Sequence, residues 1–240
     1  MRSGSDYQIL AELREAGRQF HPVAQERGGQ WQLDDGSVDL LVSAVGEGDR
    51  TLETGCGHST IAFALCGAHH TAISPTPAEQ ESLESFCRKR EIPLDRLTMI
   101  LGHSQEILPG LEPTTLDFVL IDGAHAFPVP FIDWYYAARR LKVGGLMMID
   151  DTQIRTGRIL TDFLESEVGR WRLLERRPSL VMFEKTAEPT IPAGDWPDQP
   201  YCANPERVPG LGPSTASRLR GAVRLRSRLR QVLGRPRTDR

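Results

Sequence analysis

The sequence has few cysteines and no long apolar run. Its cysteines are Cys56, Cys66, Cys87 and Cys202. They form no CxxC pair, so zinc fingers, thioredoxin-type redox sites and disulfide-stapled folds lose support. No segment approaches the roughly 18 apolar residues of a membrane-spanning helix, so we expect no integral membrane protein. The first residues are polar and lack the apolar stretch of a signal peptide, which predicts a cytoplasmic protein with reduced cysteines.

The charge is distributed unevenly along the chain. The 240 residues are 39% hydrophobic and 25% charged, with a formal net charge of −3. Residues 216–240 hold nine arginines and one aspartate, so this tail carries +8 and residues 1–215 carry −11. Apolar residues recur in the tail near helical spacing, which indicates either a basic amphipathic helix for an anionic membrane surface or solvated disorder. Nucleic-acid binding is not expected, because the body is acidic and no aromatic residues interleave the arginines.

Short apolar runs alternate with helical stretches between residues 50 and 185. The pattern predicts parallel strands at 50–53, 69–73, 97–101, 116–121 and 146–149. The intervening helices are expected at 59–65, 78–90, 131–141 and 156–168, and an antiparallel pair at 171–175 and 180–183 closes the sheet. Such alternation predicts an α/β protein with a Rossmann-like, doubly wound, mostly parallel sheet.

Four segments follow from this reading. Helices at 7–16 and 37–45 predict an N-terminal helical cap over residues 1–47, covering one end of the sheet. Residues 48–186 form the sheet domain. Residues 187–215 are rich in proline and lack periodicity, which predicts an arm or linker. Residues 216–240 are the basic tail.

Ligands of an open parallel sheet bind beyond the carboxyl ends of its strands. The first strand ends in the sequence ETGCGHST, residues 53–60. Its glycines let the backbone approach a ligand, and the next helix offers free N–H groups at its start. Glu53 would repel a pyrophosphate but could accept a hydrogen bond from an ammonium group. This segment therefore favours a zwitterionic ligand over a dinucleotide.

ETGCGHST resembles the first motif of class I S-adenosylmethionine-dependent methyltransferases. LIDGAH at 120–125, and LKVGG at 141–145 with IDDT at 149–152, resemble their later motifs. The D-G-x-H and D-D-T pieces are most similar to the branch with cephalosporin-hydroxylase-like proteins and metal-dependent O-methyltransferases. The resemblance implies S-adenosylmethionine as cofactor. Its predicted contacts are Glu53, Thr54, Gly55, Cys56, Gly57, Ser59, Thr60, Asp122 and Gly123.

Two positions depart from the family pattern. Ser74 stands after the second predicted strand, where these enzymes have an acidic residue for the ribose hydroxyls. Either Ser74 makes a weaker contact, which Ser74→Asp would strengthen, or Glu79 or another side chain takes over; Ser74 could also be only part of a turn. His103 replaces an aspartate, and with Ser104 it is expected near adenine, although a surface histidine is the alternative.

Asp122, Asp150 and Asp151 follow two strands that are expected to be neighbours. Three carboxylates together would raise one another's pKa, and Mg²⁺ would relieve that repulsion. The resemblance implies a magnesium site here; otherwise Asp150 caps Thr152 or a helix, and Asp122 only touches the cofactor. His125 is a candidate general base for a hydroxyl proton. It could instead order its loop or bind the metal or cofactor, and a bound metal would remove the need for a strong base.

The sequence therefore predicts a methyltransferase that acts on an oxygen of a small molecule or glycan with magnesium assistance. Phe127 and Pro128 are expected to line the acceptor pocket. N-methylation, or another reaction on the same fold, is the alternative among enzymes. The alternative of another class is a degenerate methyltransferase fold that acts as a peripheral membrane adaptor through the tail. Acceptor identity and oligomeric state are left open by the sequence.

Overall fold

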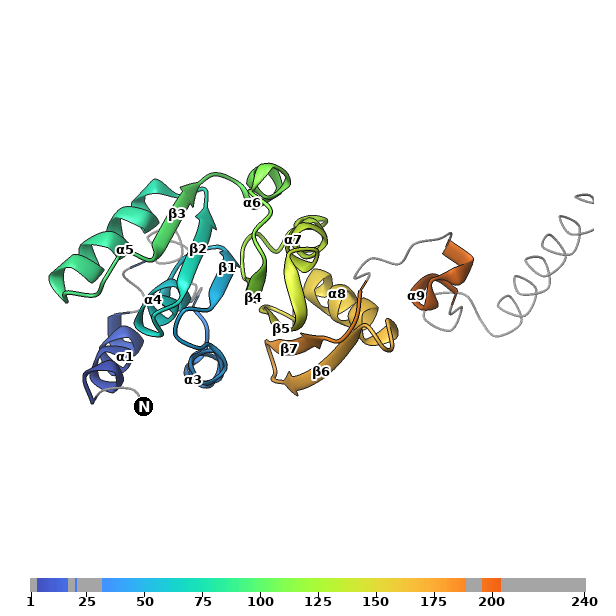
Figure 1. Cartoon of the computed structure of the whole chain (residues 1–240), viewed down its shortest axis with the longest axis horizontal. Helices are drawn as coiled ribbons and strands as arrows, with labels where there is room; N and C mark the ends of the chain where they lie inside the picture. Colours follow the sequence, from blue (N-terminus) through green and yellow to red (C-terminus); the bar gives the residue numbers. More distant parts are fainter. Residues whose placement is uncertain (1–3, 17–19, 21–31, 189–195, 204–240) are drawn as a thin grey trace, which may run out of the picture. The chain divides into compact units, whose positions relative to one another are not determined.

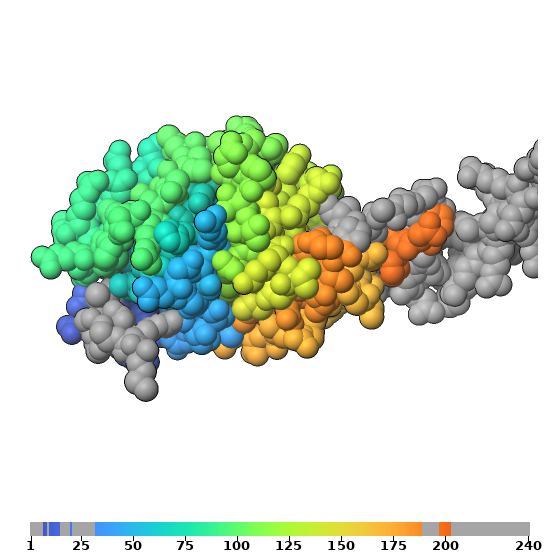
Figure 2. All heavy atoms as spheres, in the orientation of Figure 1, coloured from blue at the N-terminus to red at the C-terminus, as the bar shows by residue number. Residues whose placement is uncertain are grey.

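The computed structural model describes residues 4–16, 20, 32–188 and 196–203. The chain divides into two units, residues 1–191 and 192–240. The described part of the second unit holds a 3-10 turn, η3 (Trp196–Asp198), and a short helix, α9 (Pro200–Ala203). Most of the predicted linker and the whole predicted tail lie outside the described residues. Everything below concerns the first unit, whose residues 32–188 are drawn as one continuous body in Figure 2.

The described residues form a seven-stranded sheet in the order β3-β2-β1-β4-β5-β7-β6. Strands β1 to β5 are parallel, and β7 runs antiparallel to both β5 and β6 (Figure 1). Strand order reverses between β1 and β4. This topology confirms the predicted Rossmann-like sheet with its antiparallel closing pair. The strands are β1 (Arg50–Thr54), β2 (His69–Ser74), β3 (Leu97–Leu101), β4 (Leu116–Ile121), β5 (Leu141–Ile149), β6 (Trp171–Arg176) and β7 (Val181–Lys185).

Helices α4 (His58–Leu65) and α5 (Pro77–Lys89) follow β1 and β2 and share one apolar core with the sheet. Phe63 of α4 lies at its centre, stacked 4.1 Å from the His70 ring and 5.6 Å from the Phe118 ring. Helices α1 (Gly4–Ala16) and α3 (Asp35–Ala44) pack against α4. The predicted N-terminal helices therefore add to the helical layer over α4.

The other helices are α6 (Ser104–Ile107), the 3-10 turn η2 (Leu108–Gly110), α7 (Val129–Ala138) and α8 (Arg155–Ser166). Helix α7 packs on β4 and β5 and contacts α8, where the rings of Trp134 and Phe163 lie 4.9 Å apart. The sequence pattern did not predict the short turns at 104–110. None of the helices within the described ranges has the length and hydropathy of a membrane span.

Strand β5 begins at Leu141, five residues before its predicted start. The pair Gly144-Gly145 suggested a turn, but Leu141 pairs with Leu116 of β4, and a register shift before Phe118 absorbs the irregular backbone. Gly144 has φ +82°, a conformation that glycine adopts without strain. The Val143–Gly145 stretch is therefore part of an irregular strand.

Lys185, at the end of β7, is fully buried. Its ammonium group donates hydrogen bonds to the carbonyl oxygens of Ala138 (3.1 Å) and Leu141 (2.5 Å) and pairs with Glu188. A buried charge is tolerated only when it is paired and hydrogen-bonded. Lys185 thus joins the end of α7 to the start of β5.

Candidate functional site

A cleft of about 460 Å³ lies at the carboxyl ends of the parallel strands, the edge predicted for ligand binding. Loops after β1, β2, β3, β4 and β5 all contribute to its wall. The predicted site residues that line it are Gly55, Cys56, Gly57, Ser59, Ser74, His103, Ser104, Asp122, Gly123, His125, Asp150 and Asp151. Phe127 and Pro128, predicted for the acceptor pocket, are not among its lining residues but lie on the exposed loop after His125.

The turn after β1 requires glycine at position 55. Gly55 has φ +103°, and a Cβ atom there would stand 2.3 Å from the carbonyl oxygen of Asp122. Its N–H donates to the carbonyl of Ile73 (2.8 Å), and the Asp122 N–H donates to the carbonyl of Thr54 (3.1 Å). The turn is therefore wedged between the ends of β2 and β4. It presents backbone to the cleft at the start of α4, as a cofactor-binding turn would.

Glu53, Thr54 and Thr60 were predicted to contact the cofactor, but they do not line the cleft. Glu53 is buried behind the turn, where Thr60 donates to its carboxylate and Nε2 of His70 lies 3.2 Å away. Thr60 Oγ1 also accepts from the Gly57 N–H (2.9 Å). Alternation along β1 directs Glu53 to the α4 face of the sheet. Glu53 therefore supports the turn from behind.

The cluster at the end of β2 centres on Glu79. Ser74 Oγ donates to Glu79 Oε2 (3.0 Å), and Cys56 Sγ lies 3.8 Å from the same oxygen. Glu79 lies in the first turn of α5, is 7% exposed and lines the cleft. Burial raises the pKa of the Cys56 thiol to about 12, so it stays protonated near neutral pH. The carboxylate at this corner of the cleft comes from the helix instead of the strand end.

Asp122 and Asp150 face each other across the ends of β4 and β5. Burial raises the pKa of Asp122 well above its ordinary value, and the nearby carboxylates, that of Asp150 first, raise it further. Burial also raises the pKa of Asp150 to about 6, and its side chain is hydrogen-bonded to Asp122. The charge of the Asp150 carboxylate therefore disfavours ionisation of Asp122.

Asp151 is paired with His125. His125 Nε2 lies 3.0 Å from Asp151 Oδ2, and Gln153 donates to the other carboxylate oxygen. The hydrogen bond from His125 holds the pKa of Asp151 below its ordinary value. Asp151 has φ +54°, which is uncommon for a residue other than glycine and turns its side chain toward the loop after β4. The ionised Asp151 thereby fixes the ring of His125 at the cleft.

These contacts do not support the magnesium site predicted at Asp122, Asp150 and Asp151. Among the described residues, no group of three or more His, Cys, Asp or Glu side chains is placed to hold a metal ion. Asp122 and Asp150 bond to each other, and Asp151 is held by His125 and Gln153. Neighbouring strand ends were a sound basis for expecting three close carboxylates. The sequence could not show that Asp122 would pair with Asp150, or that Asp151 would pair with His125 and Gln153.

We expect Asp150→Asn to stabilise the protein more at pH 8 than at pH 5. The folded pKa of Asp150 is about 6, against an ordinary value of 3.8, so the folded state binds more protons between these values. Unfolding free energy therefore falls as the pH rises from about 4 to about 6, and the asparagine variant lacks this loss. Thermal melts at pH 8 should show a rise of about 2–4 °C, or roughly 1 kcal/mol for a domain of this size.

The exposed Asp95 provides a control for this measurement. Asp95→Asn should melt with the pH dependence of the wild type. Equal gains for Asp150→Asn at pH 5 and pH 8 would contradict the raised pKa of Asp150.

The sequence analysis missed several residues of the cleft. Gln32 and Leu33, which precede α3, and Ile154, which precedes α8, line it together with His58, Thr76, Gln105 and Ala124. Asp133 of α7 is fully buried beside Ser104 and Thr54, and burial raises its pKa to about 6. Gln32 and Leu33 lie about twenty residues before the first motif, whereas Ile154 follows the IDDT motif by two residues. Only the packing of α1 and α3 on α4 explains the position of the N-terminal pair.

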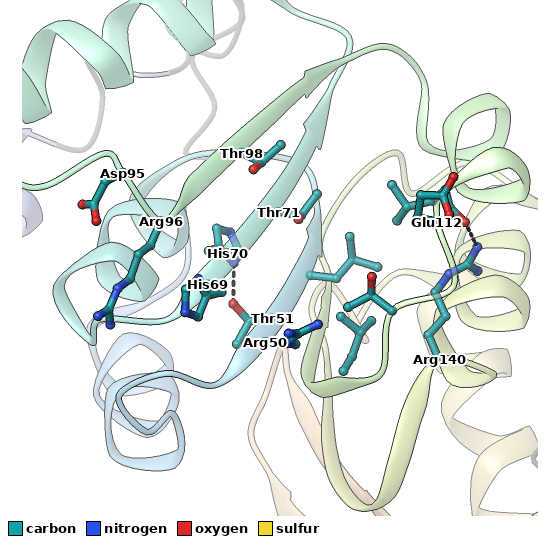
Figure 3. Close-up of a pocket in the computed structure, with 14 residues that line it drawn as sticks. Arg50, Thr51, His69, His70, Thr71, Asp95, Arg96, Thr98, Glu112 and Arg140 are labelled. Carbon is teal, nitrogen blue, oxygen red and sulfur yellow. Dashed lines mark hydrogen bonds between the residues drawn. The ribbon is translucent and has the colours of Figure 1, made fainter.

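A second cleft, of about 310 Å³, lies at the amino ends of the strands (Figure 3). Its polar lining includes Arg50, Arg96 and Arg140 with His69, and Figure 3 shows the hydrogen bond (2.7 Å) between His70 and Thr51. Arg140 is used internally, since it donates to the carbonyls of Tyr136, Leu108 and Leu111. None of the predicted site residues lines this second cleft. The candidate site is therefore the first cleft.

Comparisons with known proteins match both the sequence motifs and the fold. Residues 52–152 match a family model described as a methyltransferase domain. None of the curated proteins matches the chain. Among solved structures, the S-adenosylmethionine complex of the O-methyltransferase TomG from Streptomyces achromogenes is 17% identical, with a TM-score of 0.58 over 73% of this chain and 89% of its own.

Two further structures show the same likeness. The S-adenosylhomocysteine-bound methyltransferase PaMTH1 from Podospora anserina is 16% identical, with a TM-score of 0.57 over 74% of this chain and 88% of its own. A methyltransferase from Geobacter sulfurreducens is 13% identical, with a TM-score of 0.57 over 78% of this chain and 91% of its own. At these identities the likeness is one of fold.

Proposed function

Because the chain contains an S-adenosylmethionine-dependent methyltransferase domain of class I fold, we propose that it methylates a hydroxyl oxygen of a small molecule, with His125 as general base. The observation that carries the proposal is the His125–Asp151 pair on the wall of the cleft that holds the glycine turn. S-adenosylmethionine supplies an activated methyl group on a sulfonium centre. The chain must bind it, align the acceptor oxygen and accept one proton.

The cleft fits the cofactor along the strand ends. The Gly55–Ser59 turn offers backbone N–H groups and the start of α4 for the methionine carboxylate. Glu79 has the charge and position to accept hydrogen bonds from the ribose hydroxyls. His103 and Ser104, after β3, are proposed to face adenine. The structural feature that supports this fit is the tight turn at Gly55, which is held against the end of β4 and lines the cleft.

The proton is proposed to pass to His125. Its Nε2 faces Asp151, so that nitrogen carries the hydrogen of a bond to the carboxylate, and Nδ1 is left as the acceptor. With the cofactor bound, Nδ1 of His125 would accept the proton that the acceptor hydroxyl loses on methylation. Asp151 then stabilises the positively charged ring. No step depends on magnesium, because the three carboxylates are engaged with one another and with His125.

The ribose assignment reverses the expectation for Ser74. An aspartate at position 74 would place a second carboxylate about 3 Å from Glu79, since Ser74 Oγ lies 3.0 Å from Glu79 Oε2. We expect Ser74→Asp to weaken S-adenosylhomocysteine binding. Glu79→Gln should weaken it by roughly tenfold, because charge-assisted hydrogen bonds are worth about 1.5–3 kcal/mol.

Isothermal titration of both variants checks this assignment. Glu81, on the same helix but not on the cleft wall, provides the matched control, and Glu81→Gln should bind like the wild type. Tighter binding by Ser74→Asp would instead indicate that the ribose hydroxyls bind at the end of β2.

The proposed function is tested by titrating the full chain with S-adenosylhomocysteine and then measuring methyl transfer to a panel of hydroxyl and amine acceptors. Binding in the micromolar range and product on a hydroxyl group, unchanged by a chelator, is the expected result. Product on amines alone would favour the N-methyltransferase alternative. Absence of cofactor binding would favour the degenerate adaptor, whose proposed membrane contact lies in residues outside the described ranges.

A further inference from the structure

We propose that the acceptor is an uncharged hydroxyl compound with an apolar body, and that Ile154 and Phe127 select it. This inference rests on the proposed methyl transfer and specifies the substrate class of the same site. The observations that support it are the charge of the cleft, the residues beside the His125–Asp151 pair, and the hydrogen bonds already made at the acceptor end.

The charge of the cleft disfavours anionic acceptors. Its described lining contains four acidic residues, Glu79, Asp122, Asp150 and Asp151, and no lysine or arginine. Phosphate and carboxylate groups are recognised in proteins through arginine, lysine or clustered N–H donors. The N–H donors at the start of α4 are assigned to the methionine carboxylate of the cofactor. An acceptor with phosphate or carboxylate groups would therefore be repelled near the reacting oxygen.

The contrast with the cleft at the amino ends of the strands supports this reading. That cleft is lined by Arg50, Arg96, Arg140 and His69 (Figure 3). Among the described lining residues, arginines are present in one cleft and absent from the other, on opposite edges of the same sheet. The lack of arginine and lysine is thus particular to the described lining of the cleft at the carboxyl ends of the strands.

Exposed apolar side chains follow both members of the His125–Asp151 pair in the sequence. Ile154, three residues after Asp151, lines the cleft and is 39% exposed. Phe127, two residues after His125, lies outside the cleft lining, is 73% exposed, and its ring lies 5.9 Å from that of Phe131. Ala124 and Leu33 are also apolar residues of the wall. Exposed large apolar side chains beside a reactive pair are suited to covering the apolar body of a ligand.

The polar groups at the acceptor end are already engaged, which disfavours a glycan. Asp151 binds His125 and Gln153, and Asp150 binds Asp122. A sugar carries several hydroxyl groups, and each needs a partner when it leaves water. Among the three aspartates and the histidine described here, the Nδ1 atom of His125 is the acceptor left unassigned, which suits a compound with one hydroxyl group near the methyl donor.

The test uses the full chain saturated with S-adenosylhomocysteine and three probes: naphthol, hydroxynaphthoate and methyl glucoside. Naphthol should bind at least tenfold more tightly than the other two, as measured by calorimetry. Ile154→Arg should reverse the preference between naphthol and hydroxynaphthoate. Phe127→Ala should lower the affinity for naphthol at least threefold. Val168→Arg, at an apolar residue that is 86% exposed and remote from the cleft lining, is the matched control and should behave like the wild type.

Each outcome bears on the proposal. Tighter binding of hydroxynaphthoate or methyl glucoside by the wild type would overturn it, as would the lack of binding of all three probes. If an Ile154→Arg variant binds S-adenosylhomocysteine and still prefers naphthol to hydroxynaphthoate, that result would show that Ile154 does not contact the acceptor. Failure to bind S-adenosylhomocysteine in the first place would instead overturn the proposed function, so the two failures are distinguishable.

Discussion

Gly55→Ala is expected to abolish measurable binding of S-adenosylmethionine. The new Cβ would stand 2.3 Å from the carbonyl oxygen of Asp122, and that oxygen belongs to the backbone at the end of β4. Neither atom can move without separating the turn from β4. Alanine is also strained at φ +103°. A loss of affinity of at least a hundredfold, roughly 2.7 kcal/mol or more, should appear in a titration with S-adenosylhomocysteine.

Gly48 provides the matched control for this variant. It also has a positive φ, +80°, but a Cβ atom there would meet no atom within 4 Å. Gly48→Ala should therefore lose some thermal stability through backbone strain and keep its cofactor affinity. A circular dichroism spectrum of Gly55→Ala would show whether the sheet still forms. Wild-type affinity in a folded Gly55→Ala protein would refute the assignment of the turn.

His125→Ala is expected to lower kcat by about a hundredfold to ten-thousandfold, the usual contribution of a general base. Cofactor affinity should change little, because the contacts proposed for the methionine carboxylate, ribose and adenine follow β1, β2 and β3. Asp151→Asn should lower kcat less, since it leaves the ring in place but removes the negative charge that stabilises the protonated form. Steady-state kinetics with S-adenosylhomocysteine titrations separates the two effects.

His69 is the control for this pair of variants. It is exposed and lines the cleft at the amino ends of the strands. His69→Ala should retain wild-type kcat. Activity near the wild-type level in His125→Ala would show that another group is the general base.

Strong local patterns predicted most of the fold. Strands β3 and β4 have the predicted bounds, because each is a short apolar run between clear breakers. The carboxyl-edge cleft followed from strand order alone. Strand β5 was shortened in the prediction because its two glycines indicate a turn locally, while its pairing with β4 depends on residues more than twenty positions away.

Side-chain direction was harder to predict. The motif placed Glu53 beside the glycine turn, but alternation along the strand points its carboxylate to the α4 face. Glu79 was only an alternative because it comes five residues after Ser74, and helix geometry brings the two together. The sequence showed three carboxylates and a histidine near one edge. How they pair depends on backbone angles, such as the positive φ of Asp151, that no residue pattern displays.

The buried contacts of Glu53 constrain how this sequence can diverge. Thr51, His70, Glu53 and Thr60 come from β1, β2 and α4, and each satisfies polar atoms of another. Replacing one of them leaves buried polar groups without partners, whereas replacing the set by apolar residues of similar volume removes the need for partners. Single substitutions are expected to be purged during evolution, so neutral drift must pass through correlated changes. Among the folded variants of a library that randomises position 53 alone, most should carry glutamate. A library that randomises all four positions should also yield folded variants with apolar combinations.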